Sequence, residues 1–396
     1  MLRALLTAAF GDEELLTGGI RILAAARDPN PKTIPAAEYG RRLMKILKPV
    51  GLRITPFIAA GAAVIAVVMG FLVTAPTPAR SQAPAAPAPG FTFALIGDLG
   101  YFPREEPWVD NVFADLNRNT SLAFVVHVGD LSSPRFGCTN ELWARRLAQF
   151  RASAQPFVYT PGDNEWTDCH EPAVKGGDPL ERLAKLRTVF FDGDHTLGQR
   201  TFALARQSQS AEPAFAKYRE NVRWDLGGVT FLTLHVTGSN NGLGRSPEGD
   251  AEYADRNQAN LAWLRQGFDH AKASNSRAIM VLQQANLFPE FPPFPGTPQS
   301  PSGYTDLRVH LQKEATAFGK PIVLVHGDSH FFRIDKPLSP RPVRGTAVTP
   351  ALEHFTRVET FGSPYHHWVH VTVDASDPNV FTFRPRLVAA NMTPRQ

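Results

Sequence analysis

The sequence is poor in cysteine and has no excess of charge of either sign over most of its length. Two cysteines in 396 residues exclude a disulfide-rich scaffold and the common zinc-finger spacings. Residues 1–56 carry the whole positive surplus, and the other 340 residues hold 32 basic and 32 acidic side chains. This balance predicts no groove for nucleic acid. The His-Glu-x-x-His and Gly-x-Ser-x-Gly motifs are also missing, which argues against a protease.

The composition is otherwise that of an ordinary folded protein, with 43% hydrophobic and 20% charged residues. It provides material for one large domain or two average ones, and it excludes a multi-span membrane protein. One uncharged stretch, residues 54–79, has an apolar centre at residues 57–73 without any polar side chain. This centre lies at the short limit of roughly 17 to 25 residues for a membrane-spanning helix.

The charges that flank this stretch predict its orientation in the membrane. Three basic side chains precede it, namely Lys45, Lys48 and Arg53. The positive-inside rule therefore places residues 1–53 in the cytoplasm and the rest of the chain outside. We predict an N-terminal hydrophobic helix at residues 54–75, either a cleaved signal peptide or a retained transmembrane anchor, with a buried core helix as the alternative. The folded domain is then periplasmic or otherwise extracytoplasmic, secreted or anchored to the inner membrane.

Two segments flank the hydrophobic helix. A complete secretory signal can be read from Met44 onward. Residues 1–53 are therefore either a cytoplasmic tail or, if Met44 is the true start, a segment whose residues 1–43 are an extension ahead of it. Residues 76–90 are rich in proline and alanine, which predicts a semi-rigid linker. The folded domain is expected at residues 91–396.

Apolar strand-like runs alternate with helix-period segments in this domain. The strand-like runs are residues 91–96, 123–128, 156–160, 229–236, 278–282 and 322–326, and the helical segments are 108–117, 141–150, 257–271 and 307–318. This alternation predicts an α/β fold built of layers. The last strand-like runs, residues 356–360, 368–373 and 380–383, have no helices between them. They indicate an antiparallel edge of the sheet or the second sheet of a sandwich.

Polar side chains follow five of these strands. The sequences are Gly97-Asp98-Leu99-Gly100, Gly129-Asp130-Leu131, Pro161-Gly162-Asp163-Asn164-Glu165, Gln283-Gln284-Ala285-Asn286 and His326-Gly327-Asp328-Ser329-His330. A single Gly-Asp pair is typical of a turn, but ligands of such folds bind at the carboxyl ends of strands. Carboxylates that converge there resist burial unless a divalent cation neutralises them. Because two cations can stabilise both the attacking and the leaving oxygen at phosphorus, the pattern predicts a phosphoesterase site.

The order of these motifs resembles the calcineurin-like metallophosphoesterase superfamily over roughly residues 91–385. The first motif, Gly-Asp-Leu-Gly, is similar to that of the purple acid phosphatase branch. The resemblance implies two mixed β-sheets packed as a sandwich and flanked by helices, with a binuclear metal centre at the sandwich edge. It further implies that Asp98 and His330 hold the first metal, that Asp130 bridges, and that the third and fourth motifs hold the second metal.

At four positions the chain departs from the family pattern. Asp163 stands where the family has an Asn ligand, and Asn164 where it has the His that assists the leaving group. Gln284, or as the alternative Gln283, stands at a lone His, and Asp328 at the first His of the last motif. An oxygen-rich site of this kind favours Mn²⁺, Mg²⁺ or Ca²⁺ over Zn²⁺, with Fe as a further option.

Two further features concern the metal ligands. His326, four residues before His330, is either another ligand or a packed core histidine. The tyrosine that follows the bridging aspartate in purple acid phosphatases is missing, because Ser132 and Ser133 follow Leu131. We therefore expect no colour from a tyrosinate-to-iron bond.

The catalytic residues expected in the third motif are Asn164, Glu165 and His170. Asn164 has no proton to give, so the rate should fall by roughly 10² to 10⁴ for substrates whose leaving oxygen needs one. Glu165 and His170 are the candidate replacement acids. The expected activity is metal-dependent hydrolysis of a phosphorylated small molecule or a phosphodiester. The alternative is a catalytically weak or inactive binding protein on the same fold.

The two cysteines are expected in loops at the same end of the sheet. Cys138 follows Asp130 by eight residues, and Cys169 follows Asp163 by six. On the oxidising side of the membrane these positions predict a disulfide, and two free thiols are the alternative.

Overall fold

The computed structural model describes residues 90–170, 177–288, 302–338 and 352–392. The chain divides into two units, Met1–Gln82 and Ala83–Gln396, and all described residues belong to the second. The predicted tail and hydrophobic helix, and the linker up to residue 89, lie outside the described residues. Among the residues that are described, no helix is both long enough and apolar enough to cross a membrane.

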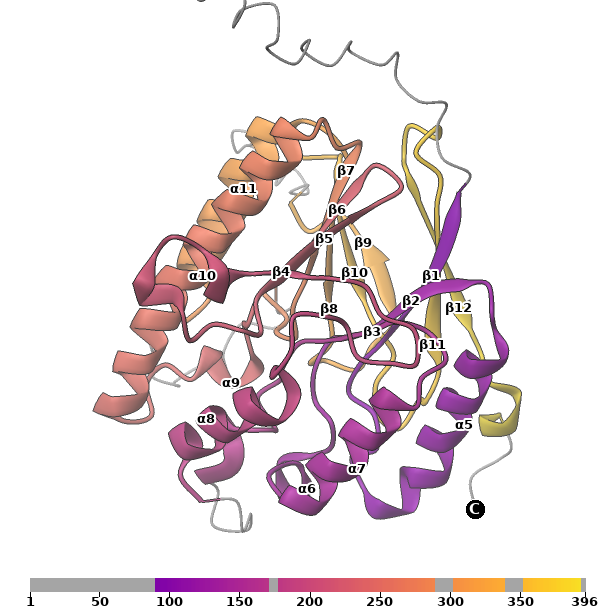
Figure 1. The fold of residues 1–396 in the computed structure, drawn as a ribbon, viewed down its shortest axis with the longest axis vertical. Helices are drawn as coiled ribbons and strands as arrows, with labels where there is room; N and C mark the ends of the chain where they lie inside the picture. Colours follow the sequence, from indigo (N-terminus) through magenta and orange to yellow (C-terminus); the bar gives the residue numbers. More distant parts are fainter. Residues whose placement is uncertain (1–89, 171–176, 289–301, 339–351, 393–396) are drawn as a thin grey trace, which may run out of the picture. The chain divides into compact units, whose positions relative to one another are not determined.

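Two mixed β-sheets form the centre of the second unit (Figure 1). The first sheet has the strand order β12-β11-β1-β2-β3. Its strands are β1 (Phe91–Ile96), β2 (Leu122–His127), β3 (Phe157–Tyr159), β11 (Trp368–Val373) and β12 (Phe381–Arg386). β1, β2 and β3 pair in parallel, whereas β11 and β12 are antiparallel to their neighbours.

The second sheet has seven strands in the order β4-β5-β6-β7-β8-β10-β9. They are β4 (Ala205–Arg206), β5 (Val222–Leu226), β6 (Val229–Thr233), β7 (Ala278–Leu282), β8 (Ile322–His326), β9 (Arg333–Asp335) and β10 (Phe355–Glu359). The central strands β6, β7, β8 and β10 pair in parallel, and the edge strands pair in antiparallel fashion. The late strand-like runs are thus shared between the sheets, because β10 joins the second and β11 and β12 join the first.

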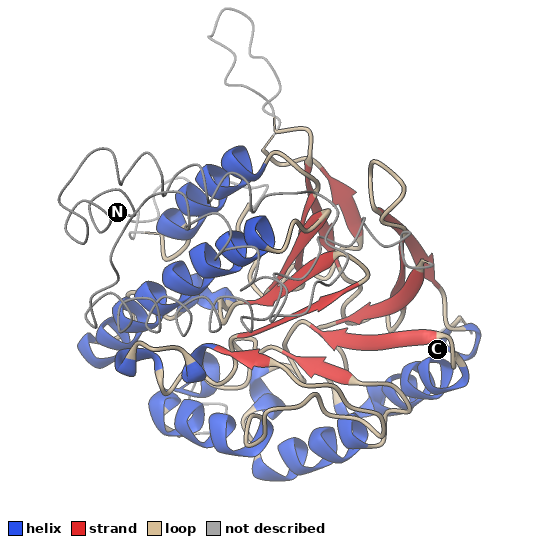
Figure 2. Cartoon of the chain, turned by 45° about the horizontal axis from the view of Figure 1, so that its top comes forward, coloured by secondary structure: helices blue, strands red, loops and turns tan. Residues whose placement is uncertain are grey.

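Alternate side chains of β1 pack into different cores, as the two-residue period of a strand requires. Phe93 and Leu95 pack with Phe231 and other side chains between the two sheets. Ala94 and Ile96 pack in a second core with side chains of the helices α5, α7 and α8. A third core joins the second sheet to α10 and α11. The order helix, sheet, sheet, helix confirms the predicted fold class, and Figure 2 shows the strands between the groups of helices.

Most of the described helices begin where the sequence supplies a capping side chain or a proline. They are α5 (Glu106–Arg118), α6 (Pro134–Gly137), α7 (Asn140–Arg151), α8 (Pro179–Phe190), α9 (Gly238–Asn241), α10 (Pro247–Ala273) and α11 (Thr305–Phe318). Short 3-10 turns lie at η2 (Pro103–Glu105), η3 (Thr167–His170), η4 (Gln207–Gln209), η5 (Pro213–Phe215) and η6 (Ala389–Asn391). Thr139 caps α7, Asp178 caps α8 and Ser246 caps α10 through side-chain oxygens that accept backbone N–H groups.

Candidate metal centre

The loops that follow β1, β2, β7 and β8 are joined by hydrogen bonds at one end of the two sheets. The backbone N–H of Asp98 donates to the carbonyl oxygen of Gly129 at 3.0 Å, and that of Gly327 donates to the carbonyl oxygen of Gln284 at 3.0 Å. The backbone N–H of Asp328 donates to Oδ1 of Asp98 at 2.9 Å, which links the two sheets. The polar strand ends therefore assemble at one place, as the sequence predicts for an α/β fold.

Four of the expected ligand residues adopt left-handed backbone conformations. The φ angles are 52° at Asp98, 56° at Asp130, 75° at Asp328 and 66° at His330. Residues other than glycine rarely adopt these angles, at a cost of about 1–3 kcal/mol each. Such strain is typical of functional sites, where the surrounding structure holds the backbone in place.

Asp98 is fully buried and receives groups from several loops. Its Oδ1 lies 3.6 Å from Nε2 of His330 and accepts a hydrogen bond of 3.4 Å from the hydroxyl of Tyr101. Its Oδ2 has no hydrogen-bond partner. Nδ1 of His330 lies 2.7 Å from the carbonyl oxygen of Ser363, which makes Nδ1 the protonated nitrogen. Nε2 of the neutral ring then carries no proton. It lies near the Asp98 carboxylate and is available to bind a cation.

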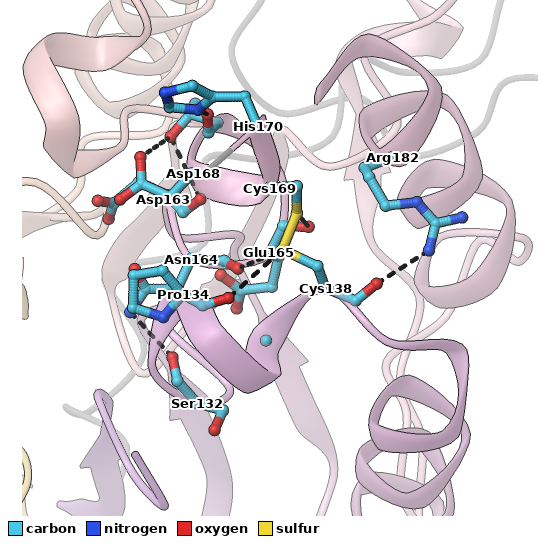
Figure 3. The surroundings of a disulfide bond; sticks show 12 residues. Ser132, Pro134, Cys138, Asp163, Asn164, Glu165, Asp168, Cys169, His170 and Arg182 are labelled. Atoms are coloured by element: carbon cyan, nitrogen blue, oxygen red, sulfur yellow. Dashed lines mark hydrogen bonds between the residues drawn. A yellow bond between two sulfur atoms is a disulfide. The ribbon is translucent and has the colours of Figure 1, made fainter. Parts of the chain in front are cut away.

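Asp130 is held by Asn164 and Tyr101. The backbone N–H of Asn164 donates to Oδ1 of Asp130 at 3.2 Å, and its side-chain Nδ2 donates to Oδ2 at 2.9 Å. The Tyr101 hydroxyl donates to the same Oδ2 at 2.5 Å. Nδ2 of Asn164 also contacts the carbonyl oxygen of Ser132 at 2.9 Å, as Figure 3 shows. Asn164 is therefore an anchor for the Asp130 carboxylate, and its amide is not a source of protons.

Asp163 and Asp328 converge on Gly238 from different strands. A Cβ added to Gly238 would lie 2.6 Å from Oδ1 of Asp163 and 2.7 Å from Oδ1 of Asp328, so only glycine fits here without displacing a carboxylate. Oδ2 of Asp163 accepts a hydrogen bond of 2.8 Å from Ser239, whereas Oδ1 has no partner. Oε1 of Gln284 accepts the N–H of Gly238 at 2.5 Å, and its Nε2 has no partner.

Burial dominates the electrostatics of this carboxylate cluster. It raises the pKa of Asp98, Asp130 and Asp163 well above the usual range of an aspartate, and the negative charges of neighbouring carboxylates raise each pKa further. Burial also raises the pKa of Asp328. No Lys or Arg forms an ion pair with any of the four within the described ranges. A cation bound among them would remove this repulsion.

The two candidate replacement acids occupy different surroundings (Figure 3). Oε1 of Glu165 accepts the N–H of Leu131 at 2.9 Å and the hydroxyl of Tyr159 at 3.0 Å, and burial raises the pKa of Glu165 to about 7. His170 is on the exposed side, where its Nδ1 lies 2.7 Å from a guanidinium nitrogen of Arg245. Glu165 therefore contacts the loop after Asp130 through Leu131. His170 instead contacts Arg245, which also forms an ion pair with Asp168.

His326 lies at the end of β8 and is fully buried. Its Nδ1 lies 2.7 Å from the carbonyl oxygen of Gly327, whereas Nε2 has no partner. Burial lowers the pKa of His326 to about 3, so the ring is neutral. A neutral ring with an unpartnered nitrogen is chemically suited to a metal, and its role stays a prediction.

The donor atoms of this site are mostly oxygens, which are of the type that divalent cations bind. No three His, Cys, Asp or Glu side chains stand together as a ready metal-holding group in the described part of the chain. The fit rests instead on two buried carboxylate oxygens without a hydrogen-bond partner, one on Asp98 and one on Asp163. Both belong to strand-end carboxylates of high pKa, and buried polar atoms of this kind are rarely left unpaired without an ion or water.

The predicted disulfide is confirmed. Cys138, next to α6, and Cys169, in η3, are bonded with an S–S distance of 2.04 Å, and Figure 3 shows the bond between the two loops. Both cysteines are 1% exposed. The bond ties the loop after Asp130 to the loop that carries Asn164. Arg182 of α8 also holds the Cys138 loop, because its guanidinium donates a hydrogen bond of 3.0 Å to the carbonyl oxygen of Cys138.

Two side chains of the site were not expected from the sequence. Tyr101 follows Asp98 by three residues, and its hydroxyl reaches both Asp98 and Asp130. Ser239 donates to Asp163 and, at 3.0 Å, to Asp168. Tyr101 lies in the loop after β1 and Ser239 in α9, each directly after a glycine. The available signal was this proximity in sequence to an expected ligand or strand end.

Comparison with known proteins leaves the family of this chain open. No family model matches the sequence, and no curated protein matches it. Solved structures that align with it include GAP50, the anchor in the inner membrane complex of Plasmodium, with a TM-score of 0.42 and 10% identity over 75% of this chain and 89% of that chain. Purple acid phosphatase PPD1 from yellow lupin (Lupinus luteus) seeds aligns with a TM-score of 0.42 and 15% identity over 78% of this chain and 57% of that one.

A further aligned structure is the 5'-nucleotidase from Candida albicans, with a TM-score of 0.38 and 9% identity over 74% of this chain and 50% of that chain. This chain therefore spans about half of the phosphatase and of the nucleotidase. All three TM-scores lie below 0.5, so the similarity assigns neither family nor activity. The functional argument rests on the residues of the site.

Proposed function

We propose that residues 91–396 form a metal-dependent phosphoesterase with a binuclear centre, which hydrolyses phosphate monoesters or diesters. The carrying observation is the group of the buried Asp98, Asp130 and Asp163 with the half-buried Asp328, none of which has a Lys or Arg ion-pair partner in the described ranges. Cations would offset this charge, and a phosphoryl group carries the negative oxygens that such cations attract.

Two cations are proposed at this end of the sheets. Asp98 and His330 would hold the first, Asp130 would be shared, and Asp163, Asp328 and Gln284 would surround the second, with His326 as a further candidate ligand. Most of these donors are oxygens, which supports Mn²⁺, Mg²⁺ or Ca²⁺ over Zn²⁺ and leaves Fe as an option. When bound, the cations supply charge stabilisation to the transferring phosphoryl group.

The protein side chains have separate proposed roles. Asn164 holds the Asp130 carboxylate in place through two hydrogen bonds. Glu165 is the better placed of the two candidate proton donors, because it lies against the Asp130 loop and its pKa of about 7 keeps a fraction protonated near neutral pH. His170, beside Arg245, is the alternative donor toward the solvent side.

An extracytoplasmic location is part of the proposal. The hydrophobic segment at residues 54–75 would export the domain as a cleaved signal peptide or anchor it to the inner membrane if it is retained. The disulfide between Cys138 and Cys169 supports this location, because such bonds persist on the oxidising side of a membrane. The substrate would then be a phosphorylated small molecule or phosphodiester outside the cytoplasm.

A second candidate is a catalytically weak or inactive binding protein. It is favoured by one observation, namely that no ready group of three His, Cys, Asp or Glu ligands exists among the residues that the structure describes. The changed ligand positions still carry oxygen donors and not apolar side chains, which supports the enzyme over this alternative.

The test is hydrolysis of aryl and alkyl phosphomonoesters and phosphodiesters by the full chain in Mn²⁺, Mg²⁺, Ca²⁺ and Zn²⁺. The matched inactive control is Asp130→Asn, which keeps the size of the side chain and removes its charge. We expect wild-type turnover that chelator removes and that the variant lacks. Metal binding without turnover of any ester would favour the binding protein, and equal turnover by wild type and Asp130→Asn would overturn the proposed site.

A further inference from the structure

We propose that a cavity beside the Asp163 loop binds the organic group of the substrate, and that this group carries an uncharged aromatic ring. The inference rests on the proposed function and names the class of phosphoester that the same site selects. Its observation is a cavity of about 330 Å³, which falls in the range of ligand pockets, roughly 300 to 1,000 Å³. The residues that line the cavity include Trp166, His170, Leu180, Gly242 and Arg245.

Hydrogen bonds join the lining of the cavity to Asp163. The backbone N–H of Trp166 donates to the carbonyl oxygen of Asp163 at 3.1 Å. The Ser239 hydroxyl donates to the carboxylates of both Asp163, at 2.8 Å, and Asp168, at 3.0 Å. Oδ1 of Asp168 in turn forms an ion pair of 2.5 Å with Arg245. A phosphoryl group held beside Asp163 would therefore place its ester substituent within reach of the cavity.

The aromatic wall of the cavity is held from the protein interior. The guanidinium of Arg256 lies over the Trp166 indole, 5.0 Å from the ring centroid. The His235 imidazole packs edge to face against the same indole, with 5.5 Å between ring centroids. Arg256 and His235 are both fully buried. These contacts fix the position of the indole before any ligand binds, which lowers the entropy cost of binding.

The charges of the lining do not favour a second anionic group. The Arg245 guanidinium donates to the carbonyl oxygen of Thr167 at 2.6 Å, and Asp168 compensates its charge. Asp178 and Glu248 add carboxylates to the described part of the lining. A further phosphate in the cavity would therefore meet negative charge, so the group that binds there should carry none.

The apolar part of the lining favours an aromatic ring. Trp166, Pro179 and Leu180 supply apolar surface, and burial of a ring against them is favourable. The planar guanidinium of Arg245, which also lines the cavity, is of the type that stacks on aromatic faces. An aromatic ring is thus the ligand that uses both kinds of surface.

The experiment compares benzyl phosphate with methyl phosphate, which share an alkyl leaving oxygen and differ in the ring. We measure kcat and KM of the full chain with Mn²⁺ for wild type and for Leu180→Trp. Leu180 is half-buried near the start of α8, and the larger side chain should fill the cavity. The KM for benzyl phosphate should rise about 10- to 100-fold relative to the KM for methyl phosphate, the range that burial of an aromatic side chain supplies. A merely structural effect would raise both KM values equally.

Leu226→Trp is the matched control, because it makes the same substitution far from the cavity. Leu226 is 38% exposed and pairs with Val229, the first residue of β6, so it lies at the opposite end of that strand from the site. Both KM values should stay at those of the wild type. Circular dichroism checks that the variants fold. If Leu180→Trp does not fold, Leu180→Ala is used instead, and it should raise the same ratio of KM values by removing a contact with the ring.

A binding measurement in chelator separates this inference from the proposed function. Saturation-transfer NMR of benzyl alcohol reports contact between the ring and the full chain without turnover. We expect a signal with wild type and Leu226→Trp that Leu180→Trp loses. No signal with wild type, an equal signal with folded Leu180→Trp, or an equal rise of both KM values overturns the cavity as the ring site, while turnover would leave the enzyme proposal standing. A signal that Leu180→Trp removes, without turnover of any ester, supports the cavity and overturns the enzyme.

Discussion

The side-chain amide of Asn164 donates a hydrogen bond of 2.9 Å to Oδ2 of Asp130. This contact joins the loop after β3 to the carboxylate proposed to be shared by two cations. It also places an amide, which has no proton to transfer, at the position that the sequence resemblance assigns to an imidazole. The effect of this amide on the rate of hydrolysis should therefore depend on the leaving group of the substrate.

Asn164→His should restore proton donation to the leaving oxygen. Alkyl phosphoesters need that proton, so their rate should rise by roughly 10² or more in the variant. Aryl phosphoesters have better leaving groups, and their rate should change little. The measurement is the ratio of aryl to alkyl turnover in wild type and variant. A wild-type ratio near one would mean that Glu165 or His170 already acts as the acid.

The stability of the metal-free protein should depend on the ionisation of Glu165. Burial raises its pKa from 4.5 to about 7. Because the folded state holds this proton more tightly than the unfolded chain, the contribution to stability is complete below pH 4.5 and is lost as the pH rises through about 7. The side chain in Glu165→Gln stays neutral, so the variant should lose nothing through this group.

We measure the free energy of unfolding of Glu165→Gln and of the wild type in urea with chelator. The value for the variant should increase relative to that of the wild type as the pH rises. Between pH 5 and pH 8 we expect a gain on the order of 3 kcal/mol. Taking the difference between the two proteins cancels the opposite effect of His127 and His326, whose pKa values are lowered to about 3 by burial. An equal difference at both pH values would contradict the assignment.

Removal of the disulfide should destabilise the fold and loosen the Asn164 loop. Cys138 and Cys169 are separated by 31 residues, and closing such a loop contributes about 3 to 4 kcal/mol in the chain-entropy model. The double change to serine should lower the free energy of unfolding in urea by that amount. The wild type with reductant is the companion measurement, because it needs no substitution. Equal stability of oxidised and reduced protein would show that the bond contributes nothing.

The fold and the location of the site could be predicted because both depend on patterns along the chain. Apolar runs followed by Asp98, Asp130 and Asp163 indicate strands whose carboxyl ends meet, and the structure brings these ends together. Tyr101 was missed for a physical reason. The direction of a side chain in a loop has no period in sequence, and here the Tyr101 side chain contacts Asp130, Asn164 and His330, which come from distant segments.

The orientation of Gln284 could not be predicted either. Its Oε1 accepts the N–H of Gly238 from another strand end, and its buried Nε2 has no hydrogen-bond partner. Sequence predicts an amide at this position, but the partner that selects between oxygen and nitrogen comes from a distant segment. Whether this side chain ligates a cation through its oxygen stays a prediction.

Gly238→Ala should separate metal binding from folding at the second proposed cation. The added Cβ would lie 2.6 Å from Oδ1 of Asp163 and 2.7 Å from Oδ1 of Asp328, so both carboxylates must move. We expect the variant to bind about one Mn²⁺ fewer per chain, by metal analysis after dialysis, with unchanged circular dichroism. Gly193→Ala is the matched control, because nothing lies within 4 Å of its added Cβ. Equal Mn²⁺ content in the two variants would mean that Asp163 and Asp328 hold no cation together.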